Sequence, residues 1–277
     1  MKLNKQILNT LILSTLTLAM TACGGSSAGD SSSCISKATD SDGDGFHDDI
    51  DIAPSDASIP GDFSTPEKIL ANPKVQKALK IAKENNVNIA TALGNNPPNL
   101  TGYYRMESGG GDIVATETGL NNSEYFYGIE TKVCTDKKYY EYVGSSFGYG
   151  NRFMGKTIVK NAMIRGDGKN FTHYIPQTII CKGERQSRIW IVSGKVNSDG
   201  NIVNRKVVFI SVGTASIAQT CNKWEVGYYE NNKKITNLDE LEYMCVDGKK
   251  AYVPGETWKN KDKESCTCTK DVEIECK

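Results

Sequence analysis

Histidine is scarce in this 277-residue chain, which contains only His47 and His173, and its nine cysteines form no CxxC pair. Zinc sites are usually built from these ligands at such spacings, so the sequence argues against a zinc site. An excess of one charge is also absent, because 33 basic side chains balance 33 acidic ones. Nucleic-acid binding calls for a basic excess or a basic stripe, so we expect no nucleic-acid partner.

An apolar run long enough to cross a bilayer is missing as well. The stretch from Ile7 to Ala22 carries no charge and follows Lys2 and Lys5. It is short for a membrane span, which needs about 20 apolar residues. A positive start, a short apolar run and small residues before a cysteine are typical of a secretory signal peptide. We therefore expect residues 1–22 to be a signal peptide and the mature chain to be exported.

The segment Leu18-Ala19-Met20-Thr21-Ala22-Cys23 resembles the lipobox of bacterial lipoproteins, although Met20 stands where that family usually has Leu. The resemblance implies cleavage before Cys23 and a lipid on its sulfur, which holds a soluble domain on a membrane without a span. In Gram-negative lipoproteins an Asp after the cysteine goes with inner-membrane retention, and Gly24 stands there instead. The expected location is therefore the cell envelope, lipid-anchored at the outer membrane. An ordinary signal peptide or an N-terminal membrane anchor is the alternative.

Residues 23–39 are rich in Gly and Ser and predict a flexible tether behind the lipid. With Cys23 lipidated, eight cysteines remain, and an even number in an exported protein predicts disulfides. The sequence does not choose among their pairings. The candidates are Cys34, Cys134, Cys181, Cys221, Cys245, Cys266, Cys268 and Cys276.

The strongest chemical motif is the loop 40–54, which begins DSDGDGFHDDID and ends at Pro54. Carboxylates recur along it, and Gly45 stands at the sixth position, where a calcium loop turns sharply. Calcium takes about six to eight oxygen ligands, and alternate acids in a tight turn supply them. The sequence therefore predicts bound Ca²⁺. The predicted ligands are Asp40, Asp42, Asp44, the backbone carbonyl of Phe46, Asp48 and Asp51.

This loop departs from an EF-hand, since Asp51 replaces Glu at the twelfth position and no helix leads into Asp40. Through Pro54 the pattern resembles a thrombospondin type 3 repeat, present in one copy. The resemblance implies calcium binding but no particular activity, and a solvated acidic linker is the alternative. We expect calcium to shorten and stiffen the tether, and His47 to be exposed.

Residues 64–94 form the predicted helical segment. Thr65 can cap a helix and Pro66 suits its first turn, whereas Pro73 interrupts the pattern. We therefore expect a short helical turn followed by a second helix that ends at Asn85-Asn86. Its apolar residues share one face, namely Val75, Leu79 and Ala82.

Residues 98–230 contain short runs rich in Tyr, Val, Ile and Phe, separated by Gly, Asn and Asp. Gly166-Asp167-Gly168 and Ser198-Asp199-Gly200 are turn signals. About eight strands at this spacing predict an antiparallel β-barrel or sandwich in a mainly β protein. The clearest runs are Tyr125–Val133, Lys138–Val143, Phe171–Cys181, Arg188–Ser193, Ile202–Val212 and Trp224–Tyr229.

Residues 231–277 hold four cysteines and are too few to build much of a core. Disulfides must restrain them, so we expect a small disulfide-rich C-terminal module. Asp247-Gly248 predicts a hairpin turn, and Tyr252 with Trp258 predicts a miniature core.

The segment from Cys245 to Trp258, followed by Cys266-Thr267-Cys268 and Cys276, resembles the first half of a von Willebrand factor type C module. One family cysteine before the CxC pair is missing, and so is the second half of the module. The resemblance implies that the module binds proteins, and a stapled cap on the β domain is the alternative.

Catalytic candidates are few. Gly144-Ser145-Ser146-Phe147-Gly148 matches GxSxG, but a nucleophile elbow runs from strand through turn to helix, and the residues that follow begin a helix poorly. We expect a glycine-rich hairpin there and read His173 as a strand-face residue. Arg165-Gly166-Asp167 spells an integrin-recognition tripeptide, which a hairpin tip explains equally well. No residue is predicted to be catalytic.

Together these features predict a non-enzymatic, calcium-binding envelope lipoprotein. Its β-rich domain would interact with a protein or glycan at the bacterial surface or in the periplasm. The alternative is a lipocalin-like carrier of a small apolar ligand, an analogy that rests on architecture alone. An envelope hydrolase with an unrecognised site is a third possibility.

Overall fold

The computed structural model describes residues 39–91, 93–106, 111–116, 129–135, 140–147, 153–181, 184–213, 224–229, 231–241 and 243–277. All of these residues belong to one compact unit of the chain. The predicted signal peptide, Cys23 and the tether up to residue 38 lie outside the described residues. Among the residues that are described, no helix has the length and apolar character needed to cross a membrane.

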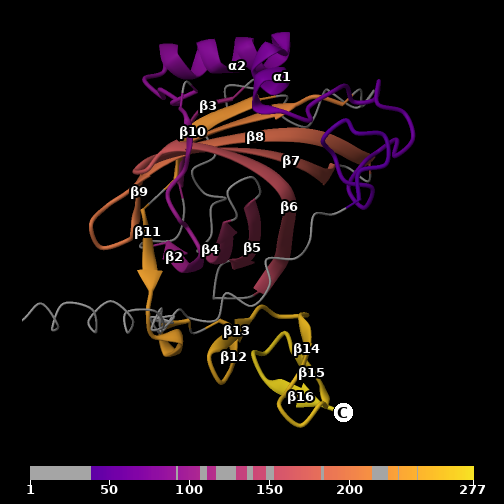
Figure 1. Ribbon diagram of the computed structural model, residues 1–277, viewed down its shortest axis with the longest axis vertical. Helices are drawn as coiled ribbons and strands as arrows, with labels where there is room; N and C mark the ends of the chain where they lie inside the picture. Colours follow the sequence, from indigo (N-terminus) through magenta and orange to yellow (C-terminus); the bar gives the residue numbers. More distant parts are fainter. Residues whose placement is uncertain are drawn as a thin grey trace, which may run out of the picture. The chain divides into compact units, whose positions relative to one another are not determined.

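The protein is mainly β, with a short helical segment ahead of all the described strands and a small disulfide-bonded module at the C-terminal end (Figure 1). This confirms the predicted fold class. The helices are α1 Pro66–Ala71 and α2 Pro73–Glu84. The strands are β1 Asn95–Asn96, β2 Gly102–Met106, β3 Gly111–Thr116, β4 Ile129–Thr135, β5 Tyr140–Phe147, β6 Phe153–Asp167, β7 Asn170–Cys181, β8 Glu184–Val196, β9 Ile202–Ser211, β10 Trp224–Tyr229, β11 Asn232–Ile235, β12 Cys245–Asp247, β13 Lys250–Tyr252, β14 Thr257–Lys259, β15 Ser265–Cys268 and β16 Ile274–Cys276.

The two helices begin and end where local chemistry dictates. The Thr65 hydroxyl accepts a hydrogen bond from the Lys68 amide at 3.2 Å, and Pro66 occupies the first turn of α1. Asn72 ends α1 and caps α2, where Pro73 again takes the first position. The helix α2 then ends at Asn85. The predicted cap, interruption and end are confirmed.

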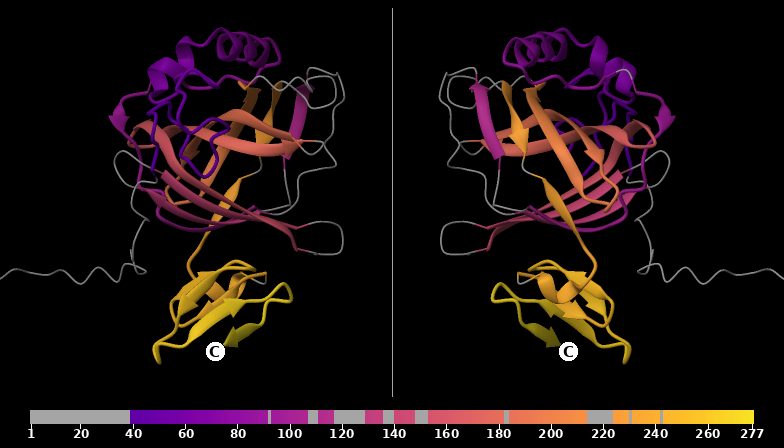
Figure 2. Two further views of the ribbon diagram at one scale, coloured as in Figure 1. Left: turned by 90° about the vertical axis from the view of Figure 1, so that its right-hand side faces the viewer. Right: turned by 90° about the vertical axis from the view of Figure 1, so that its left-hand side faces the viewer.

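The main sheet has 11 strands in the described part of the chain, in the order β11-β2-β4-β5-β6-β7-β8-β9-β10-β3, with β1 beside β6. All neighbouring pairs are antiparallel except the short β1–β6 pair. The sheet curves strongly (Figure 2), and β11 also meets β9 through one pair, Asn232 with Ile202. One pair does not close a barrel, so the arrangement is sandwich-like.

Strands β7 to β9 are buried on both faces of the sheet. Successive side chains of a strand point to opposite faces, so a strand covered on both sides has an almost continuous apolar sequence. One core cluster lies on what we call the inner face and includes Ile175, Trp190, Val192 and Phe209. The other lies on the outer face and includes Tyr174, Ile189, Ile191, Val208 and Ile210.

The helices and the aspartate loop cover the outer face (Figure 1). From α2, Val75, Ala78 and Ala82 are fully buried in this outer cluster, while the predicted Leu79 is only partly buried. The ammonium of Lys74 donates to the carbonyl of Val212 at 3.1 Å, which ties α2 to the end of β9. The segment 40–91 is therefore an integral layer of the β domain.

The C-terminal module consists of the β12–β13 hairpin and the three-stranded sheet β14-β15-β16. The hairpin turns at Gly248, as predicted, and the rings of Tyr252 and Trp258 stack at 3.8 Å between centroids. The indole nitrogen of Trp258 donates to the Asp247 carboxylate at 2.8 Å. The predicted miniature core is confirmed.

Two disulfides hold this module, Cys245–Cys268 and Cys266–Cys276. Of the other predicted disulfide cysteines, Cys34 and Cys221 lie outside the described residues. Cys134 and Cys181 lie in β4 and β7, but their side chains are not among those described.

Candidate metal centre

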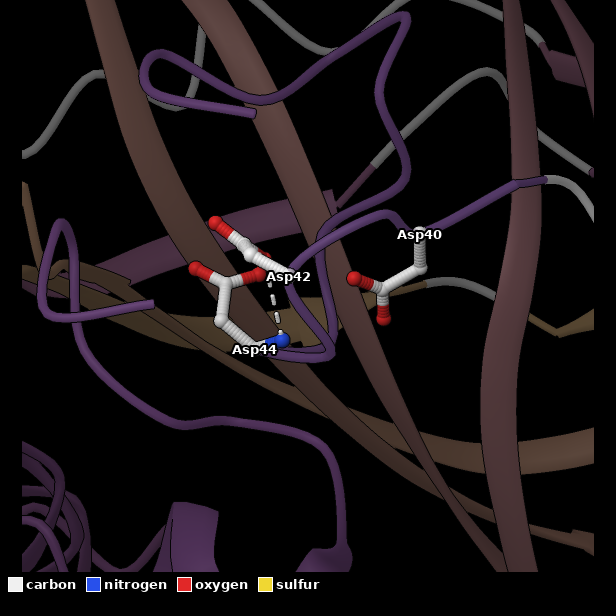
Figure 3. A group of neighbouring side chains, drawn as sticks. All are labelled: Asp40, Asp42 and Asp44. Carbon is white, nitrogen blue, oxygen red and sulfur yellow. Dashed lines mark hydrogen bonds between the residues drawn. The ribbon is translucent and has the colours of Figure 1, made fainter. Parts of the chain in front are cut away.

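Three aspartates of the loop converge. One carboxylate oxygen from each of Asp40, Asp42 and Asp44 lies within 4.8 Å of the others (Figure 3). The intervening turns need glycine, since Gly43 and Gly45 have φ of +78° and +103°. A Cβ on Gly45 would lie 2.6 Å from the backbone carbon of Phe63, so the chain passes too close there for any side chain.

Hydrogen bonds from the loop itself fix one oxygen of Asp42, Asp44 and Asp51 and both oxygens of Asp40. Asp42 Oδ1 accepts from the Asp44 amide at 3.2 Å, and Asp44 Oδ1 accepts from the Phe46 amide at 2.7 Å. Asp51 Oδ1 accepts from the Ala53 amide at 2.9 Å. Asp40 uses both oxygens to accept from the amides of Gly43 and Gly45.

The second oxygens of three aspartates are buried and accept no hydrogen bond from any described group. They are Oδ2 of Asp42, Oδ2 of Asp44 and Oδ2 of Asp51. Asp44 is 0 % exposed and Asp51 is 2 % exposed. A buried carboxylate oxygen without a partner costs about 1–3 kcal/mol or more, and native structures rarely leave one. Three in one loop fit a bound cation.

The electrostatics of the loop also favour a cation. Burial raises the pKa of Asp44 from its ordinary 3.8 to about 7, helped by the negative charges of Asp51, Asp42 and Asp40. Burial likewise raises the pKa of Asp51, with Asp42 and Asp40 adding to it. A divalent ion would remove this mutual repulsion and keep both groups ionised.

Asp48 plays a different part in the structure from the other predicted ligands. Its two oxygens accept hydrogen bonds from the amide and the hydroxyl of Ser41, both at 2.8 Å. These bonds lower the pKa of Asp48 and join the ends of the turn. The carbonyl of Phe46 stays a predicted ligand, and its ring is fully buried against Phe63, with centroids 5.9 Å apart.

Three residues outside the loop hold it, and the sequence offered no signal for any of them. The amide of Phe63 donates to the carbonyl of Asp44. From the sheet, the hydroxyl of Thr178 donates to the carbonyl of Ile50, and the guanidinium of Arg185 donates to the carbonyl of Asp49 at 3.2 Å.

The prediction that His47 is exposed was wrong. Its side chain is buried, with 4 % of the residue accessible, because the loop packs against the sheet. Its Nδ1 lies 3.9 Å from the carboxylate of Asp49.

The GxSxG serine does not sit in a nucleophile elbow. Ser146 lies within β5, paired on its two sides with Ile129 and Gly155. His173 lies in β7 opposite Ile164 of β6, nine positions along that strand from Gly155, or about 30 Å of strand. This geometry does not bring Ser146 and His173 together.

The Arg-Gly-Asp tripeptide ends β6. Arg165 donates to Glu67 of α1 at 2.9 Å, and Gly166 pairs with Phe171. Asp167 accepts from the amides of Lys169 and Asn170, which closes the β6–β7 hairpin. Each residue of the tripeptide thus has a role in the fold.

No protein-family model matches the chain, and no curated protein or solved structure matches it either.

Proposed function

We propose that this protein is a non-enzymatic, calcium-binding lipoprotein of the bacterial envelope, and that calcium holds the aspartate loop against its β domain. The observation that carries the calcium site is the set of three buried carboxylate oxygens without partners, on Asp42, Asp44 and Asp51. Hard oxygen donors on a flexible turn suit calcium better than zinc or copper.

The role of the ion in this proposal is structural. Exported modules of this kind bind calcium with dissociation constants of about 10⁻⁴ to 10⁻³ M, which suits an ion that is always present outside the cell. The loop contributes Phe46 to the outer cluster and bonds to β7 and β8. Calcium would therefore complete the outer layer of the β domain, in addition to stiffening the tether that precedes it.

Calorimetric titration of Ca²⁺ into the mature chain tests this proposal. Replacing Asp44→Asn or Asp51→Asn should abolish the heat of binding. Asp49→Asn is the matched control, since the Asp49 side chain is 80 % exposed in the same loop and the change removes the same charge. Absence of calcium uptake by the parent at millimolar ion, or equal loss in the Asp49 variant, would contradict the proposal.

The anchor is tested separately. Cys23 closes the lipobox-like segment, and its sulfur is the proposed lipidation site. Mass spectrometry of the native protein should find an acylated N-terminal cysteine, and Cys23→Ser should release the protein from membranes. An unmodified N-terminus in native cells would rule out lipidation.

The partner in this proposal is a protein or glycan met at the cell surface or in the periplasm. The disulfide-bonded C-terminal module is one place for a protein partner, by its resemblance to von Willebrand factor type C modules. The lipocalin-like alternative needs room for an apolar ligand on the inner face. Leu100 and Val207, in the apolar part of that face, already belong to one buried cluster.

A further inference from the structure

Polar side chains and one tryptophan interrupt the apolar inner face of the sheet around one level of β7, β8 and β9. Gln177 of β7 lies directly opposite Arg188 of β8, which in turn lies opposite Ser211 of β9. Gln186 and Trp190 flank Arg188 on β8, two residues away on either side. Residues two apart in a strand point to the same face. These residues stand an even number of positions from Ile175, Val192 or Phe209 of the inner cluster, so all of them lie on the inner face. We call these five residues the polar row.

Several atoms of the polar row lack hydrogen-bond partners within the described part of the chain. They are the amide oxygens of Gln177 and Gln186 and the indole nitrogen of Trp190. Gln186 is only 5 % exposed. Each such buried atom without a partner lowers the stability of the fold, and Val or Leu at these positions would avoid that loss. The row thus keeps polar groups where the fold alone favours apolar ones.

The row combines acceptors, a donor and an aromatic ring. Glutamine amides both accept and donate, the indole nitrogen donates, and a hydroxyl group complements either kind. The Trp190 ring is held edge-to-face against Phe209, with centroids 4.4 Å apart. Cross-strand neighbours have Cβ atoms about 5 Å apart, so the row spans the width of a small ring-shaped molecule.

The protein itself supplies both a positive and a negative side chain in this region, Arg188 and Glu225. Burial lowers the pKa of Arg188, and the negative charge of Glu225 on β10 opposes that shift. Glu225 pairs with Phe209, which pairs with Trp190, so the acid lies on the same cross-strand line as Trp190 of the row. A ligand here therefore needs no charge of its own.

We propose that the polar row binds a neutral, hydroxyl-rich ligand, namely a sugar residue. A wholly apolar ligand would cover the amide oxygens and the indole nitrogen without satisfying them. Gln177, Arg188 and Trp190 are each partly exposed, whereas the unpartnered atoms themselves are buried, so a sugar reaches them only after side chains of the row rotate. This site is separate from the calcium loop, which lies on the outer face of the same strands.

The test uses the mature chain saturated with calcium, with glucose and N-acetylglucosamine as probes. Calorimetry and tryptophan fluorescence should both report millimolar binding, and Trp190→Phe should remove the fluorescence change. Gln177→Leu and Gln186→Leu should each weaken binding about tenfold, equivalent to about 1.4 kcal/mol. Lys195→Gln, an exposed change on the same strand, should leave the affinity unaltered.

Two results would overturn the proposal. One is the absence of binding by either sugar up to high millimolar concentration, together with a higher melting temperature in the Gln→Leu variants, which would show that the row holds water only. The other is equal sugar affinity in the parent and both Gln→Leu variants. Neither result bears on the calcium titration, so the two proposals fail independently.

Discussion

The hydroxyl of Thr178, within β7, donates a hydrogen bond to the carbonyl oxygen of Ile50 in the aspartate loop. The two residues are 128 positions apart in the chain. Because Asp51 follows Ile50 directly, the bond ends next to one of the predicted calcium ligands. If calcium orders the loop, as we propose, its binding and the attachment of the loop to the sheet are coupled, and each should strengthen the other.

Replacing Thr178→Val tests this coupling. The change keeps the shape of the side chain but leaves the Ile50 carbonyl without its donor, which should lower the free energy of unfolding by about 1–2 kcal/mol. Calcium affinity should fall several-fold in the same variant. Urea unfolding and calorimetry measure the two effects. Thr257→Val, on the exposed face of β14, should change neither.

Removal of calcium should destabilise the β domain itself. With a dissociation constant of about 10⁻⁴ to 10⁻³ M, about 10 mM calcium should add about 1.4–2.7 kcal/mol to the free energy of unfolding. Thermal unfolding in calcium and in chelator measures the difference, with the Asp44→Asn variant as control. An ion that acted on the tether alone would leave the unfolding of the β domain unchanged.

Local signals in the sequence predicted the helices and the spacing of the aspartates that converge in the loop. Thr65, Pro66 and Pro73 act within one turn of the chain, so their effect can be read directly. The spacing of Asp40, Asp42 and Asp44 is likewise local, and these carboxylates do meet.

The docking of the loop could not be predicted, because it depends on Thr178 and Arg185, which are distant in sequence. The long strand β6 was also missed, since Gly155, Lys160 and Asn161 break any apolar pattern there. The continuous apolar run Ile189–Val192 did carry the signal of a strand covered on both faces. That signal could have shown that another layer packs on the sheet.

Gly45 should tolerate no side chain. In Gly45→Ala, the new methyl group would meet the Phe63 backbone at 2.6 Å in addition to adopting an unfavourable positive φ. Gly43→Ala is the matched control, because it shares the positive φ but has nothing within 4 Å of the added carbon. The control should cost about 1 kcal/mol and keep calcium binding. Gly45→Ala should cost more and lose calcium binding, and equal effects in the two variants would argue against the close approach.

His173 should make the protein less stable in acid. Its side chain is buried beside the Phe171 ring, and burial, with the positive charge of Arg205, lowers its pKa well below the ordinary 6.5. As the pH falls through about 6.5, His173 is protonated in the unfolded chain but not in the folded chain. The free energy of unfolding therefore decreases as the pH drops below that value. The slope reaches about 1.4 kcal/mol per pH unit. His173→Leu should flatten this part of the curve, measured in saturating calcium, and an unchanged curve would show that another group controls it.

Removing each of the two disulfides of the C-terminal module should disrupt a different part of the module. Cys245–Cys268 closes a separation of 23 residues and joins the β12–β13 hairpin to β15, whereas Cys266–Cys276 closes 10 residues within one sheet. By reducing the entropy of the unfolded chain, the longer bridge should contribute about 3 kcal/mol to the free energy of unfolding, and the shorter one slightly less. The Cys245→Ser/Cys268→Ser variant should lose the Tyr252–Trp258 stack, seen as a change in near-ultraviolet circular dichroism. Cys266→Ser/Cys276→Ser should keep the stack and lose order in β16 only, because neither ring depends on that strand for its position. Loss of the stack in both variants would show that the module folds as one unit, in which either bridge is indispensable.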